Sequence, residues 1–188
     1  MRKIKNKYES NALIEKLNLN HVASKVFDKP LGSIDPILNF MYRNEFPRYG
    51  VRTLGHGGGR FYYNLLPTEA LLVVKNNIPC MLCESLKKAD EENLIMNGEI
   101  LVSPMFTITA VLNTRKGISC REAMREGFKT YVWDDKTEQE PSVPGLKYVI
   151  DYISQHEELI GNVVEFVLYD SPVGINKENI IIWEVRDY

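Results

Sequence analysis

The sequence predicts an α+β fold: a single domain with a largely antiparallel sheet, about four to five helices and a C-terminal β-hairpin. Its 188 residues suit one domain, and 44% apolar with 26% charged residues is an ordinary globular composition. Helical patterns and hairpin patterns follow one another in mixed order, which indicates an α+β domain. We divide the chain into a basic N-terminal arm over residues 1–7 and one domain over residues 8–188.

The first two helices are predicted from their periodicity and end signals. Apolar residues recur at helical spacing over Glu9–Leu19. A second helix is expected to start at Asp35-Pro36, because aspartate accepts hydrogen bonds from exposed amides and proline needs no donor there. It has to stop near Phe46, since Pro47 disfavours helical geometry in the residue before it.

The middle of the chain offers a strand and then a helix. Ala70–Val74 is short, apolar and β-branched at its end, which favours a strand, with Asn76-Asn77 as the following turn. Pro67 keeps a helix open as the alternative. Ser85–Met96 is predicted to be helical, because it is polar-faced and Asn97-Gly98 suits a C-terminal cap.

The second half is predicted to alternate strands and helices. Ser119 and Glu122 form a capping box, in which each side chain satisfies the other's exposed amide. In order, we expect strands at Ile100–Val102 and Met105–Leu112, a helix from Ser119 to about Val132, a linker-like stretch at Asp134–Gly145, a helix through Leu146–Ile153, and strands at Val163–Tyr169 and Ile180–Val185.

A glycine-rich stretch, residues 48–74, holds the candidate site. Three consecutive glycines fit no regular element, so a loop is expected there. Glycine amides beside arginine and histidine favour an anion, whereas the simpler interpretation is a loop that docks on a partner. The candidate binding residues are Arg52, His56, Gly57, Gly58, Gly59, Arg60 and Tyr62.

Known motifs narrow the interpretation of this loop. His56 with its three glycines matches the oxyanion loop of lipases, but the chain has no Gly-x-Ser-x-Gly nucleophile motif. It also has no phosphate-loop sequence. The alternative function is a nucleotide-using transferase of the ADP-ribosyltransferase kind, with its site at Arg52–Tyr63 and a late glutamate such as Glu165 or Glu184. No diagnostic spacing of that family is present.

Three cysteines are too few for a disulfide scaffold. Cys80 and Cys83 follow an apolar segment and precede a predicted helix, where a redox pair would lie. The spacing from Cys83 to Pro104 is too short for the thioredoxin arrangement, and the neighbours of the two cysteines are apolar. Both features favour buried, structural thiols instead. A zinc site would need Cys120 or a distant histidine to complete it.

Charge and hydropathy limit the classes of partner that we expect for this protein. The formal net charge is −2 and the longest apolar run is far too short to span a membrane, so we expect neither nucleic acid nor a membrane as partner. The basic N-terminal region and the acidic residues 134–140 favour docking between proteins. We therefore expect a non-catalytic assembly protein without cofactor or catalytic residues: a cytoplasmic, soluble homo-oligomer or member of a larger complex, such as a ring or connector component of a viral particle.

Overall fold

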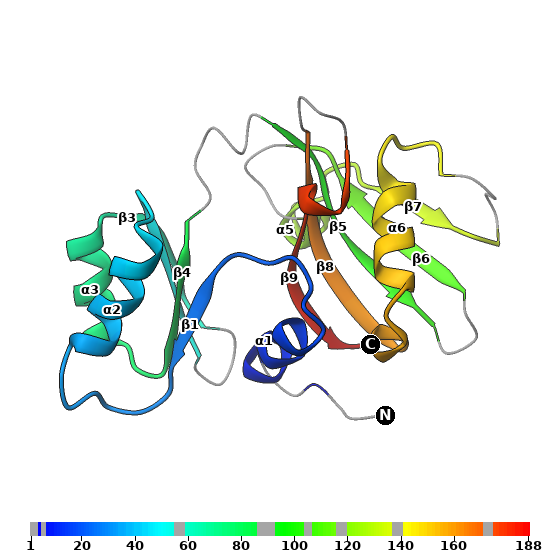
Figure 1. The fold of residues 1–188 in the computed structure, drawn as a ribbon. Helices are drawn as coiled ribbons and strands as arrows, with labels where there is room; N and C mark the ends of the chain where they lie inside the picture. The colour runs from blue at the N-terminus through cyan, green and yellow to red at the C-terminus, as the bar shows by residue number, and fades with distance from the viewer. Residues whose placement is uncertain are drawn as a thin grey trace. The chain divides into compact units, whose positions relative to one another are not determined.

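A computed structural model gives the fold of the chain (Figure 1). It describes residues 4, 7–54, 59–85, 93–103, 107–115, 120–136, 141–170 and 175–188. Within these residues the chain forms two antiparallel sheets and five α-helices, and it ends in a pair of antiparallel strands. The predicted α+β fold with its C-terminal hairpin is confirmed.

The chain contacts divide into two compact units. One comprises Met1–His21 with Ala89–Tyr188, and the other comprises Val22–Lys88. We call them the large and the small unit and describe each by itself. The division into a basic arm over 1–7 and a domain over 8–188 stays a prediction, because most of the arm lies outside the described residues.

The small unit is a four-stranded sheet with two helices. The strand order is β1-β4-β2-β3, and every neighbouring pair is antiparallel. Figure 1 shows α2 and α3 together on one side of this sheet, and their apolar residues share a core with it. The elements are β1 (Ser24–Phe27), α2 (Asp35–Asn44), β2 (Tyr49–Thr53), β3 (Phe61–Leu65), α3 (Pro67–Asn76) and β4 (Cys80–Glu84).

Helix α2 begins and ends where the sequence predicts. Pro36 lies in its first turn, and the chain leaves the helix at Glu45, whose φ is 47° and whose N–H donates to the Met41 carbonyl. Asp35 does not cap the helix, because it is already helical; its N–H donates to the Ser33 hydroxyl instead. The prediction of a helix that stops before Pro47 is confirmed.

The predicted strand at Ala70–Val74 is wrong, because these residues lie inside helix α3. Pro67 occupies the first turn, where its missing N–H costs nothing, and the Glu69 carboxylate accepts a hydrogen bond from the Leu66 N–H at 2.7 Å. Ala70 and Val74, one helical turn apart, are both fully buried. Asn76-Asn77 is therefore the end of a helix and not a hairpin turn.

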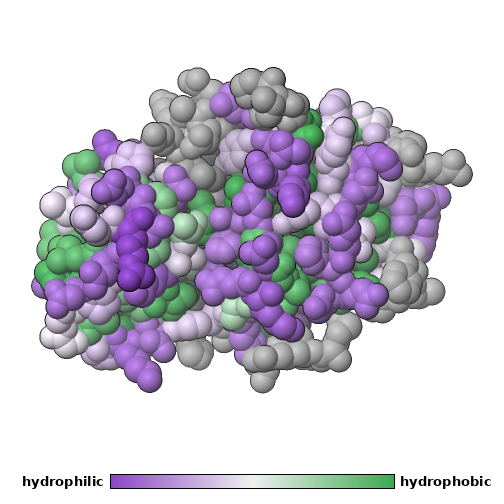
Figure 2. Space-filling model, in the orientation of Figure 1, coloured by the Kyte–Doolittle hydropathy of each residue, from purple (hydrophilic) through white to green (hydrophobic). Residues whose placement is uncertain are grey.

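The outer faces of α2 and α3 are partly apolar. Ile34, Leu38 and Leu72 expose 36%, 42% and 60% of their surface. Figure 2 shows green, hydrophobic areas on the side of the molecule where these helices lie. No helix in the described part of the chain is long and apolar enough to cross a membrane.

The large unit is a five-stranded antiparallel sheet in the order β7-β6-β5-β8-β9. Its core joins one face of the sheet to helix α6, whose Leu146, Val149 and Ile153 are fully buried. Helix α5 lies on the opposite face (Figure 1). The elements are α1 (Lys7–Lys16), β5 (Leu94–Val102), β6 (Ile108–Asn113), α5 (Cys120–Arg125), β7 (Tyr131–Asp134), α6 (Leu146–Ser154), β8 (Asn162–Tyr169), β9 (Ile180–Asp187) and two single-turn 3-10 helices, η1 (Glu157–Leu159) and η2 (Lys177–Asn179).

Two predicted helices of this unit need correction. Met96, Asn97 and Gly98 form part of strand β5, so the predicted helix end and its cap are wrong; residues 86–92 lie outside the described residues. Helix α5 does not reach Val132. It ends near Gly127, whose φ is 73° and whose N–H donates to the Met124 carbonyl, and Val132 belongs to strand β7. Of the predicted capping box, Ser119 lies outside the described residues.

Candidate ionic site on the large sheet

Three glutamates lie in line across three neighbouring strands of the large sheet. Glu99 of β5 pairs in register with Glu165 of β8, and Glu165 pairs with Glu184 of β9. Residues paired directly across strands point to the same face of a sheet. Like charges in that arrangement destabilise the sheet, so the three carboxylates need cations beside them.

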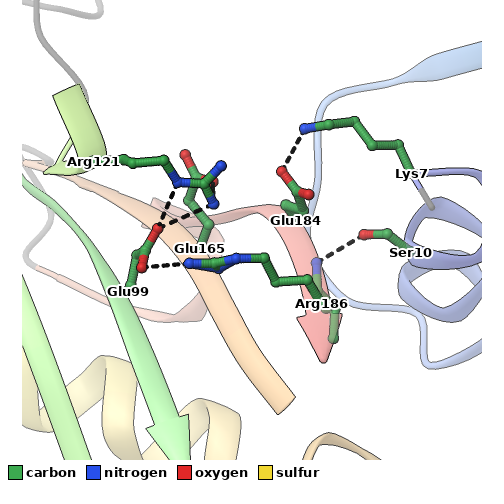
Figure 3. Close-up of polar contacts among 8 residues, drawn as sticks. Lys7, Ser10, Glu99, Arg121, Glu165, Glu184 and Arg186 are labelled. Carbon is green, nitrogen blue, oxygen red and sulfur yellow. Dashed lines mark hydrogen bonds and ion pairs between the residues drawn. The ribbon is translucent and has the colours of Figure 1, made fainter. Parts of the chain in front are cut away.

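Three cations lie beside these carboxylates (Figure 3). Arg186 of β9 donates from Nη2 to Glu99 Oε2 at 2.6 Å. Arg121 of α5 donates from Nε to Glu99 Oε1 at 3.3 Å, and its Nη2 lies 3.7 Å from a Glu165 oxygen. Lys7 of α1 forms an ion pair with Glu184. We call these six residues the ionic row: Lys7, Glu99, Arg121, Glu165, Glu184 and Arg186.

The ionic row is electrostatically coupled. Burial raises the pKa of Glu165, and the Glu184 and Glu99 carboxylates raise it further, while Arg121 and Lys7 lower it. Burial lowers the pKa of Arg121, but the nearby Glu165 and Glu99 outweigh this effect and raise it overall. The negative neighbours of Glu165 therefore disfavour the charged form of its carboxylate, whereas the Arg121 guanidinium stays charged.

A β-bulge brings Glu184 into the row. Phe166 pairs with Ile182 and Glu165 pairs with Glu184, so Trp183 is an extra residue on β9. In a regular ladder Trp183 would face Glu165, and Glu184 would face the fully buried Val164. The extra residue turns Glu184 away from the core and onto the face of Glu165.

Helix α1 covers the free edge of β9 and so positions Lys7. The Ser10 hydroxyl accepts a hydrogen bond from the Val185 N–H at 2.7 Å, and both groups are buried. Just after the helix, the Asn20 carbonyl accepts from the Ile182 N–H at 2.8 Å. These two hydrogen bonds give acceptors to backbone N–H groups of β9, which as an edge strand would otherwise leave them unpaired.

One donor in the row has no partner among the described residues. The Arg186 Nη1 atom is buried, while Nη2 of the same guanidinium is bound to Glu99. A guanidinium presents several N–H donors in a fixed plane, which matches carboxylate and phosphate oxygens. Part of the hydrogen-bonding capacity of Arg186 is therefore unused among the described residues.

The predicted loop residues lie partly outside the described chain. His56, Gly57 and Gly58 are not described, whereas Gly59 and Arg60 lie where the chain enters β3. Thr53 joins the two strands: its N–H donates to the Arg60 carbonyl at 2.9 Å, and its hydroxyl accepts from the Arg60 N–H at 2.7 Å. A Cβ at Gly59 would lie 1.7 Å from the Thr53 carbonyl oxygen, so only glycine fits there.

Arg52 and Tyr62 do not share a face of this hairpin. Arg52 pairs with Phe61, whereas Tyr62 pairs with Val51, so the two side chains point to opposite sides of the sheet. The structure thus brings Arg52, Gly59, Arg60 and Tyr62 to one hairpin but separates two of them. A ligand at this hairpin stays a prediction.

The cysteines have the features of structural thiols. Cys80 and Cys83 lie on strand β4 at an odd spacing, so they point to opposite faces, and both are buried. Burial raises their pKa values to about 11 and about 12. Burial and the neighbouring Glu99 and Glu165 raise the pKa of Cys120 to about 11. Protonated, separated thiols do not form a redox pair.

Only part of the ionic row could be predicted from the sequence. Glu165 and Glu184 stand out as carboxylates within apolar strands, and both were candidate late glutamates. That they lie side by side depends on the hairpin register. Glu99 fell between the wrongly predicted cap at Asn97-Gly98 and the strand predicted at Ile100–Val102. No signal in the sequence linked Lys7, Arg121 or Arg186 to this site.

No family model and no curated protein matches the sequence. Solved structures do match the fold. A D-alanine–D-alanine ligase from Helicobacter pylori aligns with a TM-score of 0.58 at 10% identity, over 97% of this chain and 53% of the ligase. ACD1 from Ca. Korarchaeum cryptofilum, in complex with coenzyme A, aligns with a TM-score of 0.54 at 12% identity, over 98% and 92% of the two chains. The ATP-grasp ligase PsnB, complexed with a minimal precursor, aligns with a TM-score of 0.52 at 14% identity, over 96% and 51%.

These likenesses correct the expected function. Structures with this fold include ligases, which are enzymes that use a nucleotide, so the expectation of a non-catalytic assembly protein or viral structural component is wrong. The chain spans about half the length of the D-alanine–D-alanine ligase and of PsnB. At such low identities the comparisons concern the architecture: this chain is similar in fold to ATP-grasp ligases over nearly its whole length.

Proposed function

We propose that this protein is a nucleotide-using enzyme that binds ATP and uses its cleavage to join two molecules. The observation that carries the proposal is the likeness in fold to a D-alanine–D-alanine ligase and an ATP-grasp ligase over at least 96% of the chain. A fold can host several activities, so the ionic row supplies the second line of support.

The ionic row has the chemistry to hold the phosphates of a nucleotide. Arg186 and Arg121 present guanidinium groups, and Lys7 adds an ammonium group. Guanidinium–phosphate contacts are charge-assisted and stronger than neutral hydrogen bonds. Catalysis of phosphoryl transfer depends mainly on positioning and on stabilising charge, which fixed cations provide. The glutamates keep these cations oriented before the nucleotide arrives.

The carboxylates of the row do not fit a magnesium ion in the observed arrangement. Mg²⁺ sites with ATP use one or two carboxylates together with phosphate oxygens. Both oxygens of Glu99 already accept from arginines, and an oxygen of Glu184 is held by Lys7. Among the described residues, no group of three or more His, Cys, Asp or Glu side chains is arranged to hold a metal.

Calorimetry with ATP, ADP and a non-hydrolysable ATP analogue tests the proposal. We expect binding in the micromolar range, and Arg186→Gln should weaken it by about tenfold or more, because a charge-assisted contact contributes about 1.5–3 kcal/mol. Arg125→Gln is the matched control, since Arg125 lies on the same helix as Arg121 but pairs with the exposed Glu122. Absence of binding by the wild-type protein would overturn the proposal.

The identity of the second substrate, the acceptor that is joined when ATP is cleaved, is tested by measuring product release. The matched structures name D-alanine, coenzyme A and a minimal precursor as molecules that those proteins act on or bind. ADP, AMP and phosphate release should be measured with each compound class in turn. A class that stimulates release in the wild type and not in Arg186→Gln identifies the acceptor.

This proposal keeps only the nucleotide use of the alternative drawn from the sequence and not its transferase activity of the ADP-ribosyltransferase kind. The site expected at Arg52–Tyr63 is a separate question. Arg60 lies at the base of the β2–β3 loop, and Arg52 lies on β2. If this hairpin contacts the nucleotide, Arg60→Gln should weaken ATP binding in the same calorimetric titration. Unchanged affinity would remove the hairpin from the site and leave the ionic row.

A further inference from the structure

We propose that a cleft in the large unit, between the end of α1, the end of α6 and η2, binds a small organic anion that carries a carboxylate or phosphate group beside hydroxyl groups. The cleft has a volume of about 560 Å³, which is within the range of small-molecule sites in proteins. All of its residues belong to the large unit, and none of them belongs to the ionic row. This inference therefore goes beyond the proposed function and does not depend on it.

One residue, Asn20, joins the walls of the cleft. Its side-chain Nδ2 donates hydrogen bonds to the Glu178 and Ile180 carbonyls, both at 2.8 Å. Its backbone N–H donates to the Tyr152 hydroxyl of α6 at 2.8 Å, and its carbonyl accepts from the Ile182 N–H of β9 at 2.8 Å. The walls are therefore held together by the protein itself, which lowers the cost of ordering them when a ligand binds.

Local contacts position the polar residues of the cleft. Tyr152 and His156 are four residues apart at the end of α6, and their rings lie edge to face with centroids 5.9 Å apart. Both side chains are half-buried. Lys177 lies on η2, where the Asn176 side chain accepts a hydrogen bond from the Glu178 N–H at 2.8 Å. The backbone turns that carry these side chains are therefore fixed.

Three side chains of the cleft have hydrogen-bond donors to offer a ligand. The Tyr152 oxygen accepts from the Asn20 N–H, so its own hydrogen remains, and no acceptor for it lies among the described residues. Within the same part of the chain, the His156 ring nitrogens and the Lys177 ammonium group have no hydrogen-bond or ion-pair partner. Hydroxyl, imidazole and ammonium groups all donate to carboxylate or phosphate oxygens, and the ammonium adds positive charge. These three donors favour a ligand with a negatively charged oxygen group.

The rest of the lining indicates what else the ligand carries. Glu178 is the acidic residue of the cleft, and its side chain has no ion-pair partner among the residues that the structure describes. A carboxylate only accepts hydrogen bonds, so it suits a hydroxyl group of the ligand and disfavours a second negative charge. Leu17 and Leu19 add apolar surface for the carbon skeleton. The cleft therefore suits a hydroxylated organic molecule with one anionic group.

Titration of the wild-type protein with three matched probes, followed by NMR, tests the inference. Glucose 6-phosphate carries a phosphate group, gluconate carries a carboxylate, and glucose carries neither. We expect at least one of the two anions to shift the amide resonances of Asn20, Gln155 and Lys177 to saturation, and glucose to bind about tenfold more weakly or not at all. The anion that binds more tightly shows whether the site prefers phosphate or carboxylate. Absence of these shifts with both anions, or equal affinity for glucose, would overturn the inference.

Two variants show whether the named donors bind the anion. Lys177→Gln removes an exposed charge, and His156→Phe keeps a ring against Tyr152 but removes the imidazole nitrogens. Each should weaken binding of the preferred anion by about threefold or more, with the fold checked by circular dichroism. Lys147→Gln is the matched control, because Lys147 is an exposed lysine of α6 that pairs with Asp151 and does not line the cleft. Wild-type affinity in both Lys177→Gln and His156→Phe would refute the proposed site.

Discussion

Gly98→Ala is the substitution whose cost the structure predicts most directly. Gly98 lies in the central strand β5 and pairs with Leu112 on one side and Phe166 on the other. An added Cβ would lie 2.6 Å from the Val111 carbonyl oxygen, 2.8 Å from Leu112 Cδ2 and 3.0 Å from Phe166 Cε1. Because the Val111 carbonyl belongs to the backbone, the clash can be relieved only if β5 and β6 move apart, directly beside Glu99.

The magnitude follows from overpacking in a rigid core. Adding a methyl group there typically costs about 1–3 kcal/mol of unfolding free energy. For a chain of this size, a loss of ~2 kcal/mol lowers the melting temperature by roughly 4–8 °C. Urea titration and thermal unfolding, both followed by circular dichroism, measure the two quantities.

Gly32→Ala is the matched control for this substitution. A Cβ at Gly32 would have nothing within 4 Å, and the backbone there does not require glycine. Its stability should be unchanged or higher by up to about 1 kcal/mol, because alanine restricts the unfolded chain. If Gly98→Ala unfolds at the same urea concentration as Gly32→Ala and the wild type, the packing derived for β5 is wrong.

Two further substitutions test the surroundings of the ionic row. Ser10→Ala leaves the buried Val185 N–H without its acceptor and should lower the unfolding free energy by about 1–3 kcal/mol in urea titration, whereas the exposed Ser154→Ala should change nothing; equal stabilities would contradict the edge contact. Glu165→Gln should stabilise the protein at neutral pH, because burial and the two neighbouring carboxylates raise the folded-state pKa above the unfolded one. The contribution of Glu165 is therefore most favourable below its unfolded pKa and declines as pH rises through the folded pKa, so the gain should vanish in acid; thermal melts across pH that show a loss at neutral pH would refute it.

Much of the fold was accessible from local signals. Helix α2 has its start signal, Asp35-Pro36, and its stop signal, Pro47, within a few residues of its two ends, and the apolar stripe of α6 and the strands β8 and β9 are equally local patterns. Ala70–Val74 was not accessible in this way. A run of five apolar residues fits a buried strand as well as a helix; the helix start has Pro67 in its first turn and the Glu69 carboxylate on the Leu66 N–H.

The errors at β5 and α5 have a common cause. Asn97-Gly98 is a good helix terminator in isolation, but here the glycine is required by close packing against Val111 and Phe166. That requirement comes from strands far along the chain, so a local pattern does not contain it. Likewise, the stripe that continued α5 to Val132 is interrupted by Gly127, whose positive φ ends the helix.

The ionic row shows why a site can be harder to predict than the elements that carry it. A strict two-residue alternation along β9 would place Glu184 opposite the buried Val164 and leave Trp183 opposite Glu165. One extra residue in the ladder reverses this, buries Val185 in the core and aligns Glu184, with Arg186 two positions on, along the polar face. The charge balance of the ionic row therefore depends on a single β-bulge, a feature of the pairing between two strands that neither strand encodes alone.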